Sequence, residues 1–217
     1  MANYRSMAVR ATCALPVFMA GTTPAFAHHM EGGRSPETFS DGLLSGIGHP
    51  VIGVDHFAFI VAVGIAAALA GRLWTLTITF VVGALAGCLL HVAGVTLPVA
   101  ELVITATVLL LGAIIATNRE LPAVILGVLF AGAGLFHGWA YGGSILGAEQ
   151  TPLVAYLLGF TLVQLGIAVL AGLATRWVIV NDGARRMEVR LAGAAVAGIG
   201  MALFIGNVEG ILFPGVV

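Results

Sequence analysis

The chain has 217 residues, of which 59% are hydrophobic and only 9% are charged, and its formal net charge is −1 at pH 7. A water-soluble domain carries about 25% charged residues, so this composition excludes a soluble protein and predicts a chain that is embedded in lipid. It also lacks a basic tract, which argues against nucleic acid as a partner.

Residues 1–27 have the parts of a secretory signal peptide. Arg5 and Arg10 give a positive start, a largely apolar stretch follows, and Ala-Phe-Ala at residues 25–27 matches the small-x-small cleavage pattern. The alternative is an uncleaved first helix, but two prolines and a glycine make this stretch a poor membrane span. We therefore expect cleavage after residue 27, which would leave residues 28–217 as one transmembrane domain.

The rest of the chain predicts an all-α membrane bundle. Short breaks with turn or charged residues separate six hydrophobic stretches, and we expect spans at 50–70, 73–95, 99–117, 121–140, 152–178 and 189–209. Because a signal peptide places the mature amino terminus outside, six spans place both termini in the periplasm of a bacterial inner membrane. The small residues of Gly83–Gly87 form a GxxxG pair, which favours close helix packing and is compatible with a homo-oligomer.

The distribution of arginine supports this topology independently. The predicted outer segments of the mature chain contain only Arg34, whereas the predicted cytoplasmic loops contain Arg72, Arg119, Arg176, Arg185, Arg186 and Arg190. An excess of positive charge in cytoplasmic loops is the rule for membrane proteins.

After cleavage Cys88 would be the only cysteine, so an intramolecular disulfide and a thiolate metal cluster are both excluded.

Ionisable side chains concentrate at the predicted outer ends of the spans, although helix direction alternates. These residues are His49, Asp55, His56, His91, Glu101 and His137, with His28, His29 and Glu149 in outer segments. Such groups are costly within a membrane and usually functional. Imidazole and carboxylate together suit nickel, cobalt or zinc, so the pattern predicts a divalent-metal site.

The sharpest motif is the stretch from His49 to His56. Pro50 fits the first turn of a helix, which would place His49 just above the helix and return His56 to the same face two turns later. Asp55 could bind the ion or orient an imidazole, and Gly53 leaves space between the histidines. The alternative for this motif is a polar helix cap with a buried Asp–His pair.

Other candidates are weaker when each is taken alone. His137 could be an interfacial group, because Trp139 and Tyr141 beside it fit an aromatic belt at the membrane surface. A lone His91 on an apolar helix is often hydrogen-bonded packing. Glu101 is favoured at a helix start by the helix dipole whatever its function. Gln164, in the middle of the fifth span, either lines a path for the ion or only links helices.

The motif His49-Pro-x-x-Gly-x-Asp-His56 resembles the HupE/UreJ family of nickel and cobalt permeases. The resemblance continues through Leu97-Pro98-x-x-Glu101, Phe136-His137-Gly138 and residues 147–153. It implies secondary transport of nickel or cobalt as substrate, with no permanently bound cofactor. It also implies metal-handling roles for the residues that match, which are His49, Asp55, His56, Glu101 and His137.

The chain also departs from the family pattern. Many members have a histidine-rich stretch where Trp139 and Tyr141 stand, and many have a histidine at the position of Gln164. Two other functions use the same residues. One is an intramembrane metal-dependent hydrolase, whose metal and general base His49, His56, His137 and Asp55 could supply, and the other is a sensor or scaffold that binds the ion without moving it. The hydrolase is disfavoured because no HExxH motif occurs and Ser144 lies in a Gly-rich outer loop.

Overall fold

A computed structural model of the protein describes residues 35–181 and 186–214, and within these ranges all regular structure is helical. The predicted leader and the histidines at 28 and 29 lie outside the described residues. The elements are α1 (Phe39–Ile52), α2 (Val54–Leu69), α3 (Leu73–Val92), α4 (Ala100–Ala116), α5 (Ala123–Gly142), the 3₁₀ helix η2 (Gly143–Ile145), α6 (Gln150–Asn181) and α7 (Arg186–Leu212). The prediction of an all-α membrane bundle is confirmed.

The helices are long and apolar enough for a bilayer. Among the described residues four of them, α3, α5, α6 and α7, qualify singly as membrane spans, and α1 with α2 forms a bent pair that can serve as a fifth. Helix α4 has 17 residues, which is the short end of the range for a span. The positions of the last five predicted spans agree with α3 to α7 to within a few residues.

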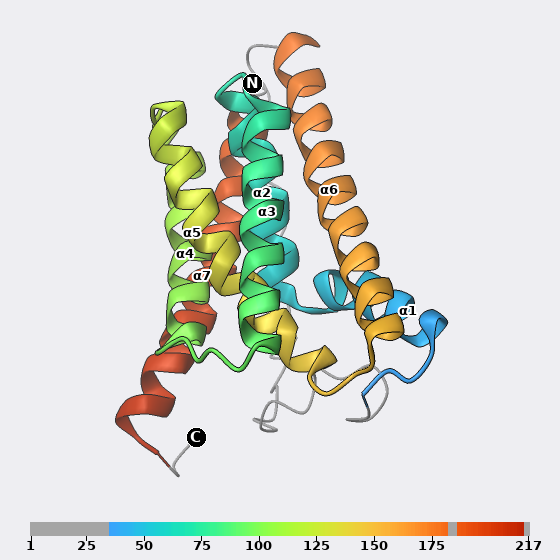
Figure 1. The fold of residues 1–217 in the computed structure, drawn as a ribbon. Helices are drawn as coiled ribbons and strands as arrows, with labels where there is room; N and C mark the ends of the chain where they lie inside the picture. Colours follow the sequence, from blue (N-terminus) through green and yellow to red (C-terminus); the bar gives the residue numbers. More distant parts are fainter. Residues whose placement is uncertain (1–34, 182–185, 215–217) are drawn as a thin grey trace, which may run out of the picture.

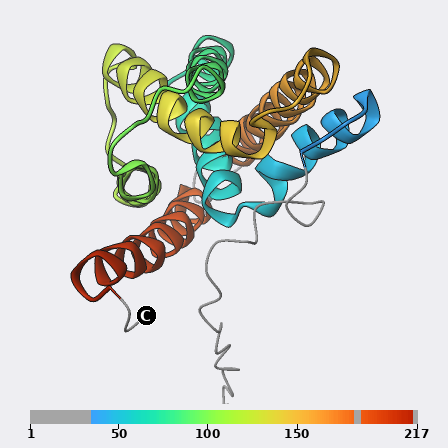
Figure 2. The ribbon, with the colours of Figure 1, turned by 60° about the horizontal axis from the view of Figure 1, so that its bottom comes forward.

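Helix α2 forms the centre of the bundle. It contacts each of the other α-helices, and 11 of its 16 residues are buried. Helix α3 packs along α5, α4 along α7, and α6 along both α1 and α2. Figure 2 shows these pairs arranged around α2 when the bundle is viewed from one end.

Small residues set the distance between the helices. A side chain at Gly87 would meet the backbone of Leu135, and one at Gly138 would meet the backbone of Ala84, so α3 and α5 touch backbone to backbone. Gly83 of the GxxxG pair also faces α5, where it lies against Ala131. Because lipid supplies no hydrophobic force between helices, such close contact is a main source of their association.

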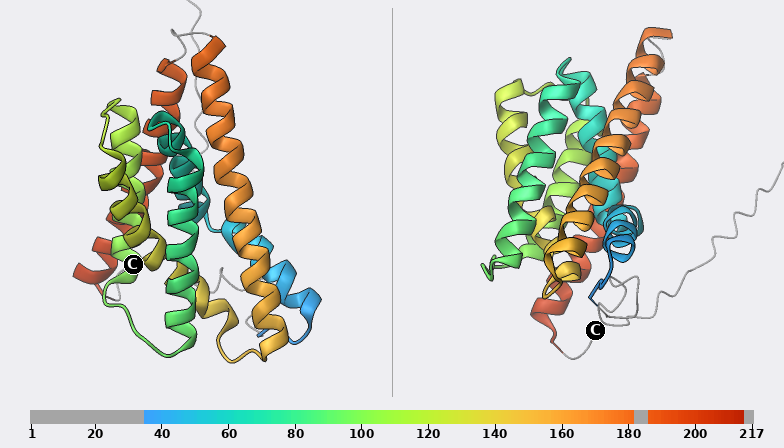
Figure 3. Two further views of the ribbon diagram at one scale, coloured as in Figure 1. Left: turned by 45° about the horizontal axis from the view of Figure 1, so that its top comes forward. Right: turned by 45° about the vertical axis from the view of Figure 1, so that its right-hand side comes forward.

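The predicted first span is wrong in its course. The helical segment begins at Phe39 rather than near residue 50, and the chain bends by 78° between α1 and α2. Figures 1 and 3 show α1 crossing the lower end of α6, while α2 runs along the bundle. Pro50 therefore lies in the last turn of α1 and not in the first turn of a span, and His49 lies within α1.

The bend has a local cause at Gly53. This residue has an extended backbone (φ −69°, ψ 105°), and its N–H donates to His49 O. Its carbonyl accepts from the Phe57 N–H, which is the first backbone hydrogen bond of α2. Upstream, α1 lies so close to α6 that a side chain at Gly42 or Gly46 would meet the α6 backbone. This contact with α6 keeps the residue before the proline helical, against its local preference.

Candidate metal site

The predicted metal ligands gather at the end of the bundle where α1 meets α2, the lower end in Figure 1. A cavity of about 130 Å³ opens there, lined by His49, Asp55, His56, Glu101, Ala140, Gly143 and Ser144. Four of the five predicted ligands line it, and they come from three different helices. The bend at Gly53 brings the rings of His49 and His56 to 5.9 Å between centroids.

The site changes from polar and open to buried over a short distance. Glu101 is exposed and Asp55 is half-buried, whereas the exposed fractions of His49, His56 and His137 are 7%, 3% and 0%. The carboxylates therefore lie toward the surface and the imidazoles deeper in the bundle. An ion that approached from this end would meet carboxylate oxygens before ring nitrogens.

His137 lies behind His56 and does not line the cavity. Its Nδ1 is 2.9 Å from Nδ1 of His56, and its Nε2 is 3.1 Å from the Thr107 hydroxyl, which itself donates to Ile104 O at 2.7 Å. A hydroxyl has one proton and a carbonyl only accepts, so Thr107 must accept from the Nε2–H of His137. Nδ1 of His137 then accepts from His56, whose lone pair is left on Nε2.

This hydrogen bond gives His137 a role other than the predicted one of metal ligand. Metal-binding histidines usually donate their second ring N–H to a partner that fixes the tautomer and the orientation of the ring. His137 is such a partner for His56. Its ring is held by stacking on Phe59, at 4.3 Å between centroids and 21° between planes. The geometry thus favours His137 as a residue that positions His56, rather than as a direct ligand.

His49 is held by groups from η2 and α6. Its Nδ1 is 2.8 Å from the Ser144 hydroxyl and 3.4 Å from the Tyr156 hydroxyl. Tyr156 donates to Tyr141 O at 2.9 Å, which ties α6 to the end of α5. Both histidines of the cavity are therefore oriented through Nδ1.

Tyr141 contradicts the prediction of an interfacial residue. Its exposed fraction is 0%. The centroid of its ring lies 4.9 Å from that of the His49 ring and 4.5 Å from that of the His56 ring. The sequence held a signal for this placement, because Tyr141 and Ser144 follow His137 by four and seven residues. At those intervals side chains share one face of a helix.

Two further candidates lie away from the cavity lining. The His91 ring stacks on Trp139 at 4.1 Å, and its Nδ1–H donates to Trp139 O at 2.6 Å, so His91 joins α3 to α5. Trp139 in turn donates to Val95 O. Glu149 is exposed, directly before α6.

Gln164 is fully buried in α6, and neither polar atom of its amide has a hydrogen-bond partner in the structure. The buried hydroxyls of Tyr141 and Thr161 are also without one. A buried polar group that makes no hydrogen bond costs about 1–3 kcal/mol. Water or an ion that reached these groups would remove that cost.

Within the described residues, no three His, Cys, Asp or Glu side chains are placed to hold a metal ion together. The cavity contains the right donor types, but they stand apart and are engaged with the protein. For example, the Asp55 carboxylate accepts from the backbone N–H of His56 at 2.8 Å. Coordination at this site would require side-chain rotation toward the ion.

The fold and the cavity define a class, that of polytopic helical membrane proteins with imidazole and carboxylate groups collected at one end of the bundle. The family model described as HupE / UreJ protein matches residues 16–203. The chain belongs to the HupE/UreJ family, which confirms the resemblance seen in its motifs.

A curated relative agrees with this assignment. Protein HupE of Rhizobium leguminosarum bv. viciae is 32% identical over 186 residues, which cover 84% of this chain and 92% of that protein. No solved structure matches the chain.

Proposed function

We propose that the protein is a permease, and not an enzyme, that takes up nickel or cobalt ions across the bacterial inner membrane. The observation that carries the proposal is the cavity that two imidazoles and two carboxylates line at one end of an apolar bundle. These donors suit divalent nickel and cobalt, and charged groups at membrane depth usually serve an ion path. Membership of the HupE/UreJ family supports the same class of substrate.

In this proposal Asp55 and Glu101 attract the hydrated ion at the outer surface. His56, which has its lone pair on Nε2, and His49 then replace hydration water. The histidines at 28 and 29, His91 and Glu149 supply further donors on the route to the cavity. A divalent cation gains about 4–5 kcal/mol per 100 mV when it moves inward, so the membrane potential can drive uptake.

The inward route in this proposal passes Gln164. Its buried amide has no partner, and Tyr141, whose hydroxyl is also unpartnered, lies between the cavity histidines and Phe160, one helical turn before Gln164. The two groups can offer oxygen atoms to an ion or its water as it leaves the imidazoles. Both belong to the protein interior, where such oxygens replace bulk solvent.

The test is accumulation of nickel and of cobalt in cells that express the wild type or His56→Ala at matched membrane levels. We expect accumulation above the empty-vector level for the wild type and its loss for the variant. Trp177→Phe, on an exposed residue of α6 outside the cavity lining, serves as the control and should accumulate like the wild type. Wild-type accumulation no greater than that of the empty vector would refute transport of these ions.

One observation favours the hydrolase as a second candidate, namely the 2.8 Å contact between Ser144 and His49. A serine nucleophile needs a base at such a distance. In the transporter, the Ser144 hydroxyl only orients His49, so Ser144→Ala should lower uptake by about ten-fold without abolishing it. Complete loss of metal uptake in Ser144→Ala, while the purified variant still binds metal, would favour the hydrolase.

A further inference from the structure

A larger cavity than the histidine-lined one lies at the opposite end of the bundle. It has a volume of about 500 Å³, within the roughly 300–1,000 Å³ of small-molecule sites. It lies between the inner ends of α2, α4, α5, α6 and α7, and much of its wall is apolar. The apolar wall includes Ala68, Leu69, Ile115, Leu121, Leu126 and Ile179.

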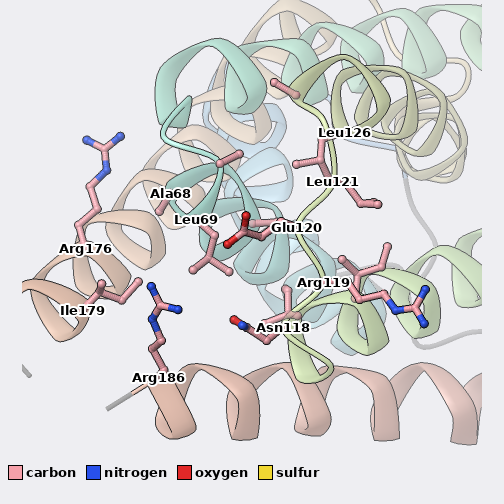
Figure 4. A pocket seen from close by; sticks show the side chains of 15 residues that line it. Ala68, Leu69, Asn118, Arg119, Glu120, Leu121, Leu126, Arg176, Ile179 and Arg186 are labelled. Atoms are coloured by element: carbon pink, nitrogen blue, oxygen red, sulfur yellow. The ribbon is translucent and has the colours of Figure 1, made fainter. Parts of the chain in front are cut away.

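Three arginines from three parts of the chain line the same cavity. They are Arg119 in the α4–α5 loop, Arg176 in α6 and Arg186 at the start of α7. Among the described lining residues Glu120 is the one carboxylate. Figure 4 shows the Arg186 side chain reaching toward the pocket and Glu120 near its middle, whereas the guanidinium groups of Arg176, on the same side, and Arg119, on the far side, are turned away from the middle. Among the described residues none of these arginines forms an ion pair.

The charge of this cavity excludes a second station for a divalent cation. Among the described lining residues, three arginines against one carboxylate leave an excess of two positive charges. A positive charge on an apolar wall at a membrane surface fits an anionic amphiphile, because the arginines can bind a phosphate while the leucine and alanine side chains contact hydrocarbon. Arginine is well suited to this, since its planar fork binds phosphate oxygens in pairs.

We propose that this cavity binds an anionic phospholipid, with its phosphate held by Arg186, and by Arg176 once that side chain turns toward it, and with its acyl chains along the apolar wall beside Leu69. The site lies at the end of the bundle that the arginine distribution assigns to the cytoplasm. A bound lipid would join the start of α7 and the end of α6 to the α4–α5 loop. This inference does not depend on the transport of any ion.

The experiment compares the thermal unfolding of the purified full-length protein with added phosphatidylglycerol and with added phosphatidylcholine. We expect the anionic lipid to raise the melting temperature more than the zwitterionic lipid does. Arg186→Gln should weaken the response to phosphatidylglycerol about five-fold in lipid concentration, because one arginine near a membrane surface contributes about that factor. Glu120→Gln should strengthen it, since it removes a negative charge from the same cavity.

The matched control is Arg72→Gln. Arg72 is exposed at the turn between α2 and α3, at the same end of the bundle, but does not line the cavity. It should respond to phosphatidylglycerol like the wild type. Equal stabilisation by the two lipids, or an equal loss in Arg72→Gln and Arg186→Gln, would overturn the proposal. Full stabilisation by inorganic phosphate alone would show a free-anion site instead of a lipid site.

Discussion

At the scale of single residues, the tautomer of His56 is the feature that matters most for metal chemistry. The chain of hydrogen bonds from Ile104 O through Thr107 and His137 places a proton on Nδ1 of His56. Nε2 is therefore the nitrogen that can bind an ion. The two bonds of His137 are not local, because it is 30 residues from Thr107 and 81 residues from His56 in the sequence.

Thr107→Val tests this chain with almost no change of side-chain shape. The substitution removes the acceptor for the Nε2–H of His137, and a buried donor without a partner costs about 1–3 kcal/mol. If the proton moves to Nδ1 of His137 instead, His56 loses its acceptor. Either way we expect nickel or cobalt to bind about ten-fold more weakly in a titration of the purified protein, at the lower end of the effects of residues that orient metal ligands.

Thr79→Val is the matched control, because the hydroxyl of the half-buried Thr79 also donates to a carbonyl of its own helix but does not line the cavity. It should bind metal like the wild type. Wild-type affinity in Thr107→Val would mean that His137 does not set the tautomer of His56.

At the scale of elements, the break between α1 and α2 creates the site. A continuous helix would place His49 and His56 two turns apart along one face, about 10 Å in rise. The bend at Gly53 instead turns α1 beneath α6 and closes the two rings around one cavity. The break therefore brings the two histidine rings together, which the predicted straight helix could not do.

Gly53→Ala should impair the site without unfolding the bundle. Alanine can adopt the backbone angles of Gly53, but its Cβ would lie 2.8 Å from Cδ2 of His56 and 3.3 Å from Oδ1 of Asp55. Both side chains would have to shift. Small displacements in a precisely arranged site can lower its rate up to about a hundred-fold. We therefore expect metal uptake to fall at least about ten-fold at an unchanged membrane level.

The control for this substitution is Gly132→Ala in α5, where an added Cβ meets no atom within 4 Å. That variant should take up metal normally. Normal uptake in Gly53→Ala as well would show that the space between the two histidines does not limit the site.

At the scale of the whole molecule, the two ends of the bundle differ in charge and chemistry. The imidazole-lined cavity lies at one end and the arginine-lined cavity at the other. The arginine distribution predicts that the first end faces the periplasm. An importer needs this direction, because the carboxylates must face the side from which the ion arrives.

Single cysteines can test the orientation. Cys88 is the free cysteine of the described residues and is buried, so Cys88→Ala gives a background with little reactivity of its own. On that background Glu149→Cys should react with a membrane-impermeant maleimide added to intact spheroplasts. Arg119→Cys, exposed at the other end, should react only after the membrane is opened. The reverse labelling pattern would invert the topology and contradict uptake through the histidine end.

The sequence alone determined the class of the protein and most of its helices. Composition requires lipid as the solvent, and long apolar stretches placed α3, α5, α6 and α7 to within a few residues. Because helix direction alternates, it also predicted that His49, Asp55, His56 and Glu101 would gather at one end, as they do around the cavity. These inferences succeed because hydrophobicity and helical rise are local properties.

Only the tertiary structure decided how the site is assembled. Residue spacing gives the relative rotation of side chains only along an unbroken helix. The prediction from spacing therefore failed where Gly53 interrupts the helix. It also could not show that His137 stands behind His56, or that Tyr141 is buried against both cavity histidines. These positions depend on the contact of α1 with α6 and on how α2 packs in the bundle, because packing between distant segments leaves no periodic signal in the sequence.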